Sequence, residues 1–379
     1  MSIKKILLAT RPLTPPWDEA SKNFSYFLAK SIKDPELQIN ILTTPTKLDG
    51  LGDTVVAHLI FPLYDASRAG HSFSQKVTLS KYLFTKSCQY DIVHYLFTPT
   101  ALNSALIKNL TYRRPKTIQT IATLREDLYG PEDWKKMLFA DRIVTYSDYS
   151  KHKLEEVGFE NVTKIYPGID LNLYSPQPKD EATMKHFNIT PDDFVLSYFG
   201  EYARLGATDM LVEMLVKQLK NNSEKNIRFI FACRVKNDAD QKKKDEVVEK
   251  LTQAGIIDRV RFSDTFKDMP KLYNLTDIVL FPVENMRGKF DIPLVIIEAY
   301  ACGKPVIVTD LPIFKEFVSE SIATIVPAGN SGDLWNAIKG LISDEGKLKA
   351  QGKSARAFVE QYFDLRNTAR EYEKLYQSL

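Results

Sequence analysis

The sequence predicts an α/β protein of two doubly wound domains, each with a parallel β-sheet covered by helices. Short β-branched apolar runs recur along the 379 residues, and a longer segment of helical period follows each run. A chain of this length also exceeds one hydrophobic core of ordinary size. The polar, proline-rich stretch 175–193 interrupts the alternation, so we place the division between the domains there.

The first domain is predicted over residues 1–175. Its expected strands are 6–9, 39–42, 91–95, 117–121 and 142–145, with helices over 21–32 and about 147–157. Residues 176–192 predict a linker, and residues 193–355 predict the second domain. Its expected strands are 195–200, 227–232, 259–262, 277–281, 305–308 and 323–326. Residues 356–379 have helical period without a following strand, and we expect this helix to pack back on the first domain.

Two such domains facing each other would form a cleft, since ligands of open parallel sheets bind beyond the carboxyl ends of the strands. The net charge of +3 and the 44% apolar content are typical of a soluble protein and do not indicate a nucleic-acid binder. Residues 1–175 carry a surplus of about four basic residues. This surplus is compatible with an acidic acceptor, a peripheral membrane contact or an ordinary solvated face.

Localisation and metal content follow from what the sequence lacks. No apolar run approaches the roughly 20 residues that cross a bilayer, and the start does not resemble a signal peptide. We therefore expect a cytoplasmic protein, at most at the inner face of a membrane. The three cysteines, Cys88, Cys233 and Cys302, form no CxxC pair, so neither a zinc site nor a disulfide framework is indicated.

The most informative stretch is 288–307. Pro293 favours a helix start there, and free amides at a helix start suit a diphosphate. Asp291 lies where it would cap this helix or serve as a catalytic carboxylate. Glu298 falls among apolar residues, where a buried carboxylate needs hydrogen-bond donors. A ribose diol would supply them, and a structural salt bridge is the alternative.

The run DIPLVIIEAYACGKPVI, residues 291–307, resembles the signature of GT-B glycosyltransferases of family 4. Residues 140–176 and 269–282 are similar to the end of that family's first domain and to the strand before its donor loop. The first strand, the YFG of 198–200 and the EYEKLY of 371–376 follow in the same order, so the resemblance covers about nine-tenths of the chain. It implies a GT-B fold of two Rossmann-like domains.

The resemblance also implies a retaining, metal-independent transfer of a hexose from a UDP- or GDP-linked sugar to a glycan or lipid-linked acceptor, with no further cofactor. Glu298 would hold the ribose, and Arg204 would neutralise the leaving diphosphate. The other donor-binding residues that the family pattern implies are Gly200, Phe266, Asp268, Ile292, Pro293 and Leu294. Asp291 and Arg204 are the catalytic candidates.

Several positions depart from the family pattern. Phe290 replaces the usual first glutamate, Ala122 replaces a histidine that faces the donor sugar, and Glu201 replaces an arginine. One interpretation is a divergent enzyme that uses Asp291 and Arg204 instead. The alternatives are a nucleotide-sugar-binding protein with impaired catalysis, or a sugar-nucleotide epimerase or hydrolase.

The acceptor side carries weaker candidates. The loop after the first strand lacks the family's glycine-rich turn and contains Trp17 and Asp18, which could bind acceptor hydroxyls. His94 is another candidate for the cleft. For Trp17 and His94 the alternative is packing inside their own domain.

Overall fold

The computed structural model describes residues 3–15, 17, 19–63, 72–110, 115–220, 226–264 and 266–379. The chain divides into two units. Unit 1 consists of Met1–Asp170, Gly288–Asp291 and Phe363–Leu379, and unit 2 consists of Leu171–Arg287 and Ile292–Tyr362. The expected linker 176–192 is therefore wrong: it belongs to unit 2 and contains a helix, α6 (Glu181–His186), capped by Asp180.

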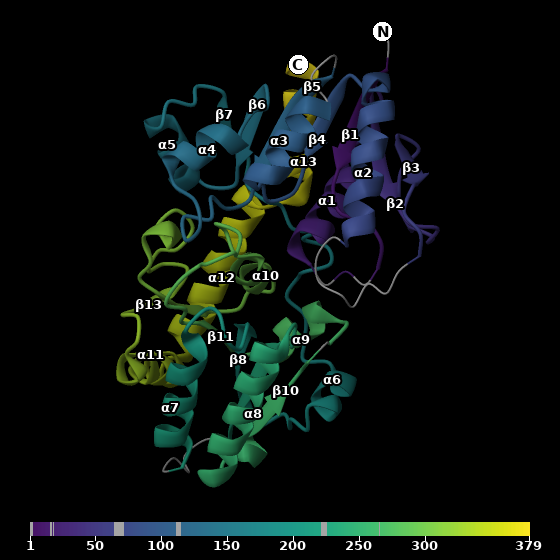
Figure 1. Ribbon diagram of the computed structural model, residues 1–379. Helices are drawn as coiled ribbons and strands as arrows, with labels where there is room; N and C mark the ends of the chain where they lie inside the picture. The colour runs from purple at the N-terminus through teal and green to yellow at the C-terminus, as the bar shows by residue number, and fades with distance from the viewer. Residues whose placement is uncertain are drawn as a thin grey trace. The chain divides into compact units, whose positions relative to one another are not determined.

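The described residues of unit 1 hold a parallel seven-stranded sheet in the order β3-β2-β1-β4-β5-β6-β7 (Figure 1). The strands are β1 (Lys4–Ala9), β2 (Leu37–Thr43), β3 (Val55–Leu59), β4 (Ile92–Tyr95), β5 (Lys116–Ile121), β6 (Arg142–Thr145) and β7 (Val162–Lys164). The helices are α1 (Ala20–Ser31), α2 (Phe73–Lys86), η1 (Ser87–Gln89), α3 (Ala101–Leu110), α4 (Pro131–Met137), α5 (Asp148–Glu156) and α13 (Leu365–Ser378).

Alternate residues of β1 face the two helical layers of unit 1. Ile6 and Leu8 pack in a core with residues of α1 and α13, whereas Leu7 and Ala9 pack in a second core with residues of α2 and α3. Both sets are fully buried, as expected for a central parallel strand covered on both faces.

The described residues of unit 2 hold a parallel six-stranded sheet in the order β10-β9-β8-β11-β12-β13. The strands are β8 (Phe194–Gly200), β9 (Ile227–Cys233), β10 (Val260–Phe262), β11 (Ile278–Phe281), β12 (Val306–Thr309) and β13 (Thr324–Val326). The helices besides α6 are α7 (Ala207–Leu219), α8 (Asp238–Gln253), η2 (Ile257–Arg259), α9 (Met269–Leu275), α10 (Leu294–Ala301), η3 (Pro312–Phe314), α11 (Ser331–Ser343) and α12 (Glu345–Tyr362).

The C-terminal helix α13 is part of unit 1. Asp364 caps the helix and also forms a parallel β-bridge with Ile169. Gly168 approaches this helix so closely that an added Cβ would lie 2.5 Å from the Leu365 Cα. Residues 356–362, which we expected to share this helix, form the last part of α12 in unit 2. Among the described helices, none is both long and apolar enough to cross a bilayer.

Candidate functional site

The carboxyl edge of the unit 2 sheet gathers most of the predicted donor-side residues. From β8 the chain adds β9 and β10 on one side of the sheet and then β11, β12 and β13 on the other. The topological switch point of this open sheet therefore lies between β8 and β11. Gly200 ends β8, and the loop after β11 leads to α10. Ligands of doubly wound sheets bind at such a switch point, so this edge is the candidate ligand-binding site of unit 2.

Two glycines shape the turn between β8 and α7. A Cβ on Gly200 would lie 2.1 Å from the Tyr198 ring, so a side chain at this position would clash with that tyrosine. Gly206 has φ of 81° and precedes α7, a conformation that side chains rarely adopt. The turn between them carries Glu201 and Arg204, and the backbone path of this turn requires glycine at both of its ends.

Glu201 holds two cations at this edge. Its carboxylate is 4% exposed and accepts hydrogen bonds from Arg204 Nε and Nη2, both at 2.8 Å. Lys236, which follows β9, donates to the same carboxylate at 2.6 Å. The two cations and one anion leave a net charge of +1, and both basic side chains remain partly exposed. Such a cluster presents fixed positive charge of the kind that binds phosphate.

Lys236 is a basic residue that our sequence reasoning missed. It comes from a strand other than the one that carries Arg204, and only the parallel order β9-β8 brings the two together. The signal in the sequence that could have indicated Lys236 is its position just after the carboxyl end of the predicted strand 227–232. Glu201, which stands where the family has an arginine, orients Arg204 and Lys236 instead of contributing positive charge.

The start of α10 offers two backbone amides, those of Leu294 and Val295, that have no partner among the described hydrogen bonds, whereas the Ile296 amide donates to the Pro293 carbonyl. Pro293 is the N-cap residue of α10, with φ of −65° and no side-chain cap. The alternative that Asp291 caps this helix is therefore wrong. Ile292 and Pro293 are buried and Leu294 is partly exposed. The first amides of a helix lack intrahelical partners and carry the positive end of the dipole, so this start can receive an anion.

Glu298 lies just over one turn into α10 and is partly exposed. Its carboxylate accepts a hydrogen bond from the Tyr273 hydroxyl at 2.7 Å and another from the Tyr174 hydroxyl. Burial raises the pKa of Glu298 from 4.5 to about 7, while the two hydroxyls act in the opposite direction. Phe199 stacks on Tyr273 with the ring centroids 4.0 Å apart. The partners are neutral hydroxyl groups, so the structural salt bridge considered as an alternative is not what the contacts show.

Phe266 and Asp268 lie after β10 with local partners. The Phe266 ring packs against His186 and Phe187 at the end of α6. Asp268 is exposed and is the N-cap residue of α9, where its side chain accepts from the Lys271 amide. Both residues have structural roles in unit 2, and a contact with the nucleobase stays a prediction.

Asp291 belongs to unit 1 and is buried there. Its carboxylate is 2% exposed and accepts hydrogen bonds from the Ser147 hydroxyl at 2.7 Å and from the Ser150 hydroxyl. Its amide donates to the Ala122 carbonyl at 2.8 Å. Burial is the main cause that raises the pKa of Asp291 from 3.8 to about 7. The catalytic role predicted for Asp291 stays a prediction, and in this structure its carboxylate meets hydroxyl groups of unit 1 in place of solvent.

The acceptor-side candidates lie in unit 1. Trp17 stacks on Tyr26 of α1 with the centroids 4.2 Å apart, and Asp18 lies outside the described residues. His94 is fully buried: its Nδ1 pairs with the Tyr376 hydroxyl at 2.7 Å and its Nε2 with the Thr120 hydroxyl at 2.6 Å. Burial lowers the pKa of His94 from 6.5 to about 3, so the ring is neutral at physiological pH. With both nitrogens used, His94 is a core residue and the cleft role is not supported.

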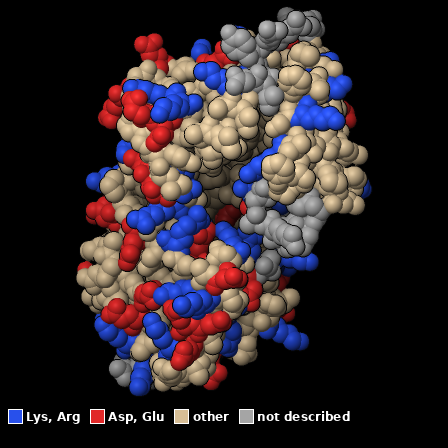
Figure 2. All heavy atoms as spheres, in the orientation of Figure 1, with Lys and Arg blue, Asp and Glu red and all other residues tan. Residues whose placement is uncertain are grey.

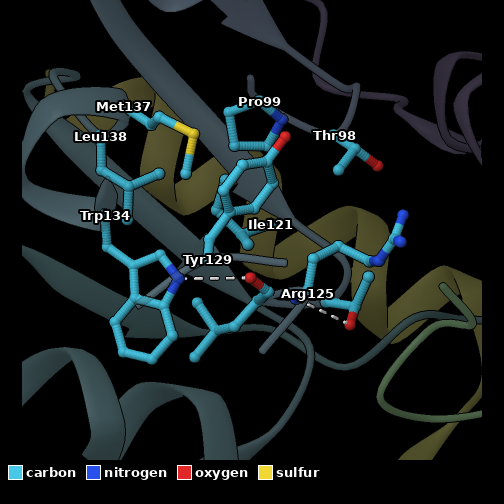
Figure 3. A pocket seen from close by; sticks show the side chains of 10 residues that line it. Thr98, Pro99, Ile121, Arg125, Tyr129, Trp134, Met137 and Leu138 are labelled. Carbon is cyan, nitrogen blue, oxygen red and sulfur yellow. Dashed lines mark hydrogen bonds between the residues drawn. The ribbon is translucent and has the colours of Figure 1, made fainter. Parts of the chain in front are cut away.

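A pocket opens at the carboxyl ends of β4 and β5 in unit 1 (Figure 3). Its enclosed volume is about 10 Å³, which is room for about one water molecule and far below that of a typical small-molecule site. Its lining residues are Thr98, Pro99, Ile121, Thr123, Leu124, Arg125, Tyr129, Trp134, Met137 and Leu138. Arg125 has φ of 54° and forms a bidentate pair with Asp127. A non-glycine residue in this conformation at a sheet's ligand-binding edge is a candidate for substrate contact.

Comparison with known proteins identifies a family for part of the chain. Residues 193–344, which include the Glu201 cluster and α10, match the family described as Glycosyl transferases group 1. The chain carries a group 1 glycosyltransferase domain. The chain is 24% identical over 283 residues to the lipopolysaccharide core biosynthesis mannosyltransferase LpsB of Rhizobium meliloti, with 73% of this chain and 76% of that protein covered.

A second relative and two solved structures extend the comparison. This chain is 25% identical over 226 residues to a D-inositol 3-phosphate glycosyltransferase of Kribbella flavida, and the match covers 57% of this chain but only 51% of that relative. Anabaena Alr3699/HepE in complex with UDP-glucose superposes with a TM-score of 0.75 at 19% identity, covering 99% of this chain and all of that chain. The sucrose-phosphate synthase of Thermosynechococcus elongatus gives 0.76 at 16% identity, covering 99% and 98%. The predicted GT-B fold is confirmed, and the predicted glycosyltransferase family is matched over residues 193–344.

Proposed function

We propose that this glycosyltransferase moves a hexose from a UDP- or GDP-linked sugar to a glycan or lipid-linked acceptor. The observation that carries the proposal is the carboxylate of Glu298, which lies near the start of α10 among neutral hydroxyl donors. Hydrogen bonds from a ribose diol would suit this carboxylate, because no cation neutralises it in the described contacts. UDP-glucose in the similar Anabaena structure is in keeping with a sugar-nucleotide donor.

Each part of the donor has a matching group in unit 2. The ribose would meet Glu298, and the diphosphate would meet the first amides of α10 together with Arg204 and Lys236. Charge on the diphosphate grows as the sugar departs, so fixed cations there lower the barrier to departure. Glu201 positions both cations and keeps them from folding away into solvent.

The transfer is proposed to retain the anomeric configuration and to need no metal, as the family resemblance implies. The C1–O bond to the phosphate breaks, and the acceptor hydroxyl attacks C1 from the face that the phosphate leaves. The acceptor's proton passes to the departing phosphate oxygen. The unit 1 surface beside Arg125 and Tyr129 is proposed to contact part of the acceptor. The reaction is proposed to take place in the cytoplasm.

A specific observation favours one second candidate, a protein that binds nucleotide sugars without turning them over. Phe290, Ala122 and Glu201 stand at three positions where the family has functional side chains, and Asp291 is buried. Binding and turnover must therefore be measured separately.

The melting temperature in the presence of a panel of sugar nucleotides tests the proposal. A donor at about 100 times its Kd adds about 2.7 kcal/mol to the native state, which raises the melting temperature by several degrees. At least one UDP- or GDP-linked sugar should do so in the native protein, and Glu298→Ala should abolish the shift. If no sugar nucleotide shifts the melting temperature, the proposal fails.

A further inference from the structure

Two tyrosines from outside α10 hold the carboxylate of Glu298. Tyr273 lies on α9, which contacts α10, and its hydroxyl donates to Glu298 Oε2 at 2.7 Å. Tyr174 lies near the start of unit 2, and its hydroxyl also bonds to this carboxylate. The two rings meet edge to face, with their centroids 6.0 Å apart. Two hydroxyl groups from separate segments of unit 2 thus converge on one carboxylate.

Each tyrosine is also fixed by a contact that does not involve Glu298. Phe199 stacks on Tyr273 with an angle of 11° between the ring planes. Arg356 of α12 donates from Nη1 to the Tyr174 carbonyl at 2.9 Å. The rest of unit 2 therefore holds both tyrosines in place, as expected for residues that orient a binding group.

The two hydroxyl groups act as hydrogen-bond donors. Burial raises the pKa of Tyr273 and the pKa of Tyr174 well above 10, so each hydroxyl keeps its single proton at neutral pH. An ionised carboxylate offers about four acceptor positions, and the tyrosines take two of them. Two positions remain, which is the number that the two hydroxyl groups of a ribose diol need. Donation by the tyrosines also favours the ionised form of Glu298.

The other groups near Glu298 bring no opposite charge to it. Cys302 follows α10, and burial raises the pKa of its thiol to about 12, so the thiol is neutral. Lys304 and Arg356 donate to backbone carbonyl groups. Basic and acidic side chains are interspersed over the visible face of unit 2 (Figure 2), so the surface there supplies no broad field of one sign. The protonation of Glu298 therefore depends on its burial and on the two tyrosine hydroxyls.

We propose that Tyr273 and Tyr174 are positioning residues that hold the Glu298 carboxylate in place as the acceptor for a ribose diol. The role rests on the proposed function, because the diol belongs to the sugar-nucleotide donor. The tyrosines occupy one part of the carboxylate and leave the other part to the ligand. Without their hydroxyl groups the buried carboxyl would keep its proton to a higher pH and would accept from the ribose less well. The two tyrosines thus set the pH range over which the donor binds.

Replacing one hydroxyl at a time tests this role. Tyr273→Phe keeps the ring that stacks on Phe199 and removes the hydrogen bond to Glu298. Because a hydrogen bond to a charged group is strong enough to move a pKa by about one unit, Glu298 should titrate about one pH unit higher in Tyr273→Phe. Tyr174→Phe should have the same effect. Titration of the ¹³Cδ resonance of Glu298 in the full chain measures the shift without a donor, and Glu298→Gln identifies the resonance.

Isothermal titration with a sugar nucleotide measures the consequence for binding. With the midpoint moved from pH 7 to about 8, the ionised fraction at pH 7 falls from about one half to about one-eleventh. The Kd of Tyr273→Phe should therefore be about fivefold above that of the native protein at pH 7, but within about 1.5-fold of it at pH 8.5. In the Glu298→Gln background, Tyr273→Phe should have no further effect.

Tyr300→Phe is the matched control. Tyr300 is fully buried on the same helix as Glu298, and its hydroxyl has no hydrogen-bond partner in the described part of the chain. This variant should keep the native midpoint and the native Kd. An unchanged Glu298 midpoint in both Tyr273→Phe and Tyr174→Phe would overturn the role, as would a shifted midpoint with native donor affinity at pH 7. A Kd raised equally at pH 7 and pH 8.5 would also overturn it, because a general structural loss has that effect. Failure of the proposed function is a different result, since the native protein would then bind no sugar nucleotide at any pH, and the role would fail with it.

Discussion

Protonation of Glu298 should control the affinity for the donor. Burial raises the pKa of this carboxyl from 4.5 to about 7, and ribose hydroxyls donate only to the ionised form with full strength. Donor binding should therefore strengthen as the pH rises through 7. With a pKa of 7, the ionised fraction is about nine-tenths at pH 8 and about one-thirtieth at pH 5.5. The Kd of the donor should therefore be about thirtyfold higher at pH 5.5 than at pH 8.

Isothermal titration with an intact sugar nucleotide measures this dependence, because its diphosphate diester does not titrate between pH 5.5 and 8. Glu298→Gln should bind weakly at both pH values and lose most of the dependence. Lys339→Gln, which changes an exposed residue of α11, serves as a control that should keep the pH dependence. A native Kd that is constant from pH 5.5 to 8 would refute the role of Glu298, as would an unchanged pH dependence in Glu298→Gln.

Three further predictions concern the donor cations and the core of unit 1. Arg204→Ala and Lys236→Ala should each weaken nucleoside diphosphate binding about tenfold or more, measured by titration, because each removes a charge-assisted hydrogen bond; equal affinity would place the diphosphate elsewhere. The folded pKa of Asp291 is raised from 3.8 to about 7, so its contribution to stability is lost as the pH rises between these values. The free energy of unfolding of Asp291→Asn, relative to that of the native protein, should therefore rise by up to about 4 kcal/mol from pH 4 to pH 8, measured by urea unfolding. A difference between the two proteins that does not change with pH would contradict this. Tyr376→Phe leaves Nδ1 of the buried His94 ring without its partner and should cost about 1–3 kcal/mol in the same assay, while an unchanged unfolding midpoint would contradict the pairing.

The alternation of apolar strands and helices was sufficient to predict the fold. Parallel strands buried on both faces are continuous apolar runs, and β1, β8 and β11 have this character and the predicted positions. The strands β3 and β7 were missed because they lie at the two edges of the sheet, where little of a strand is buried. Of their eight residues, only Val162 is buried. The expected linker contained α6 because its prolines flank a short helix that Asp180 caps.

The site was predictable only where one segment carries it. The run around Glu298 marks both the helix start and the carboxylate. The partners of this carboxylate, Tyr273 and Tyr174, come from other segments, and no local pattern connects them. Asp291 lies beside the same signature, yet its amide and carboxylate bind residues that follow β5 and β6, which sequence spacing does not reveal.

The central claim is that the chain transfers a hexose from a nucleotide sugar bound by unit 2. Transfer of ¹⁴C-labelled hexose into lipid and glycan fractions tests it most directly, with each sugar nucleotide that raises the melting temperature used as donor. The native protein should incorporate label, and Arg204→Ala and Glu298→Ala should reduce the rate at least about tenfold at a fixed, subsaturating donor concentration. Binding of a sugar nucleotide without incorporation into any fraction would contradict the claim and would favour a protein that only binds its donor.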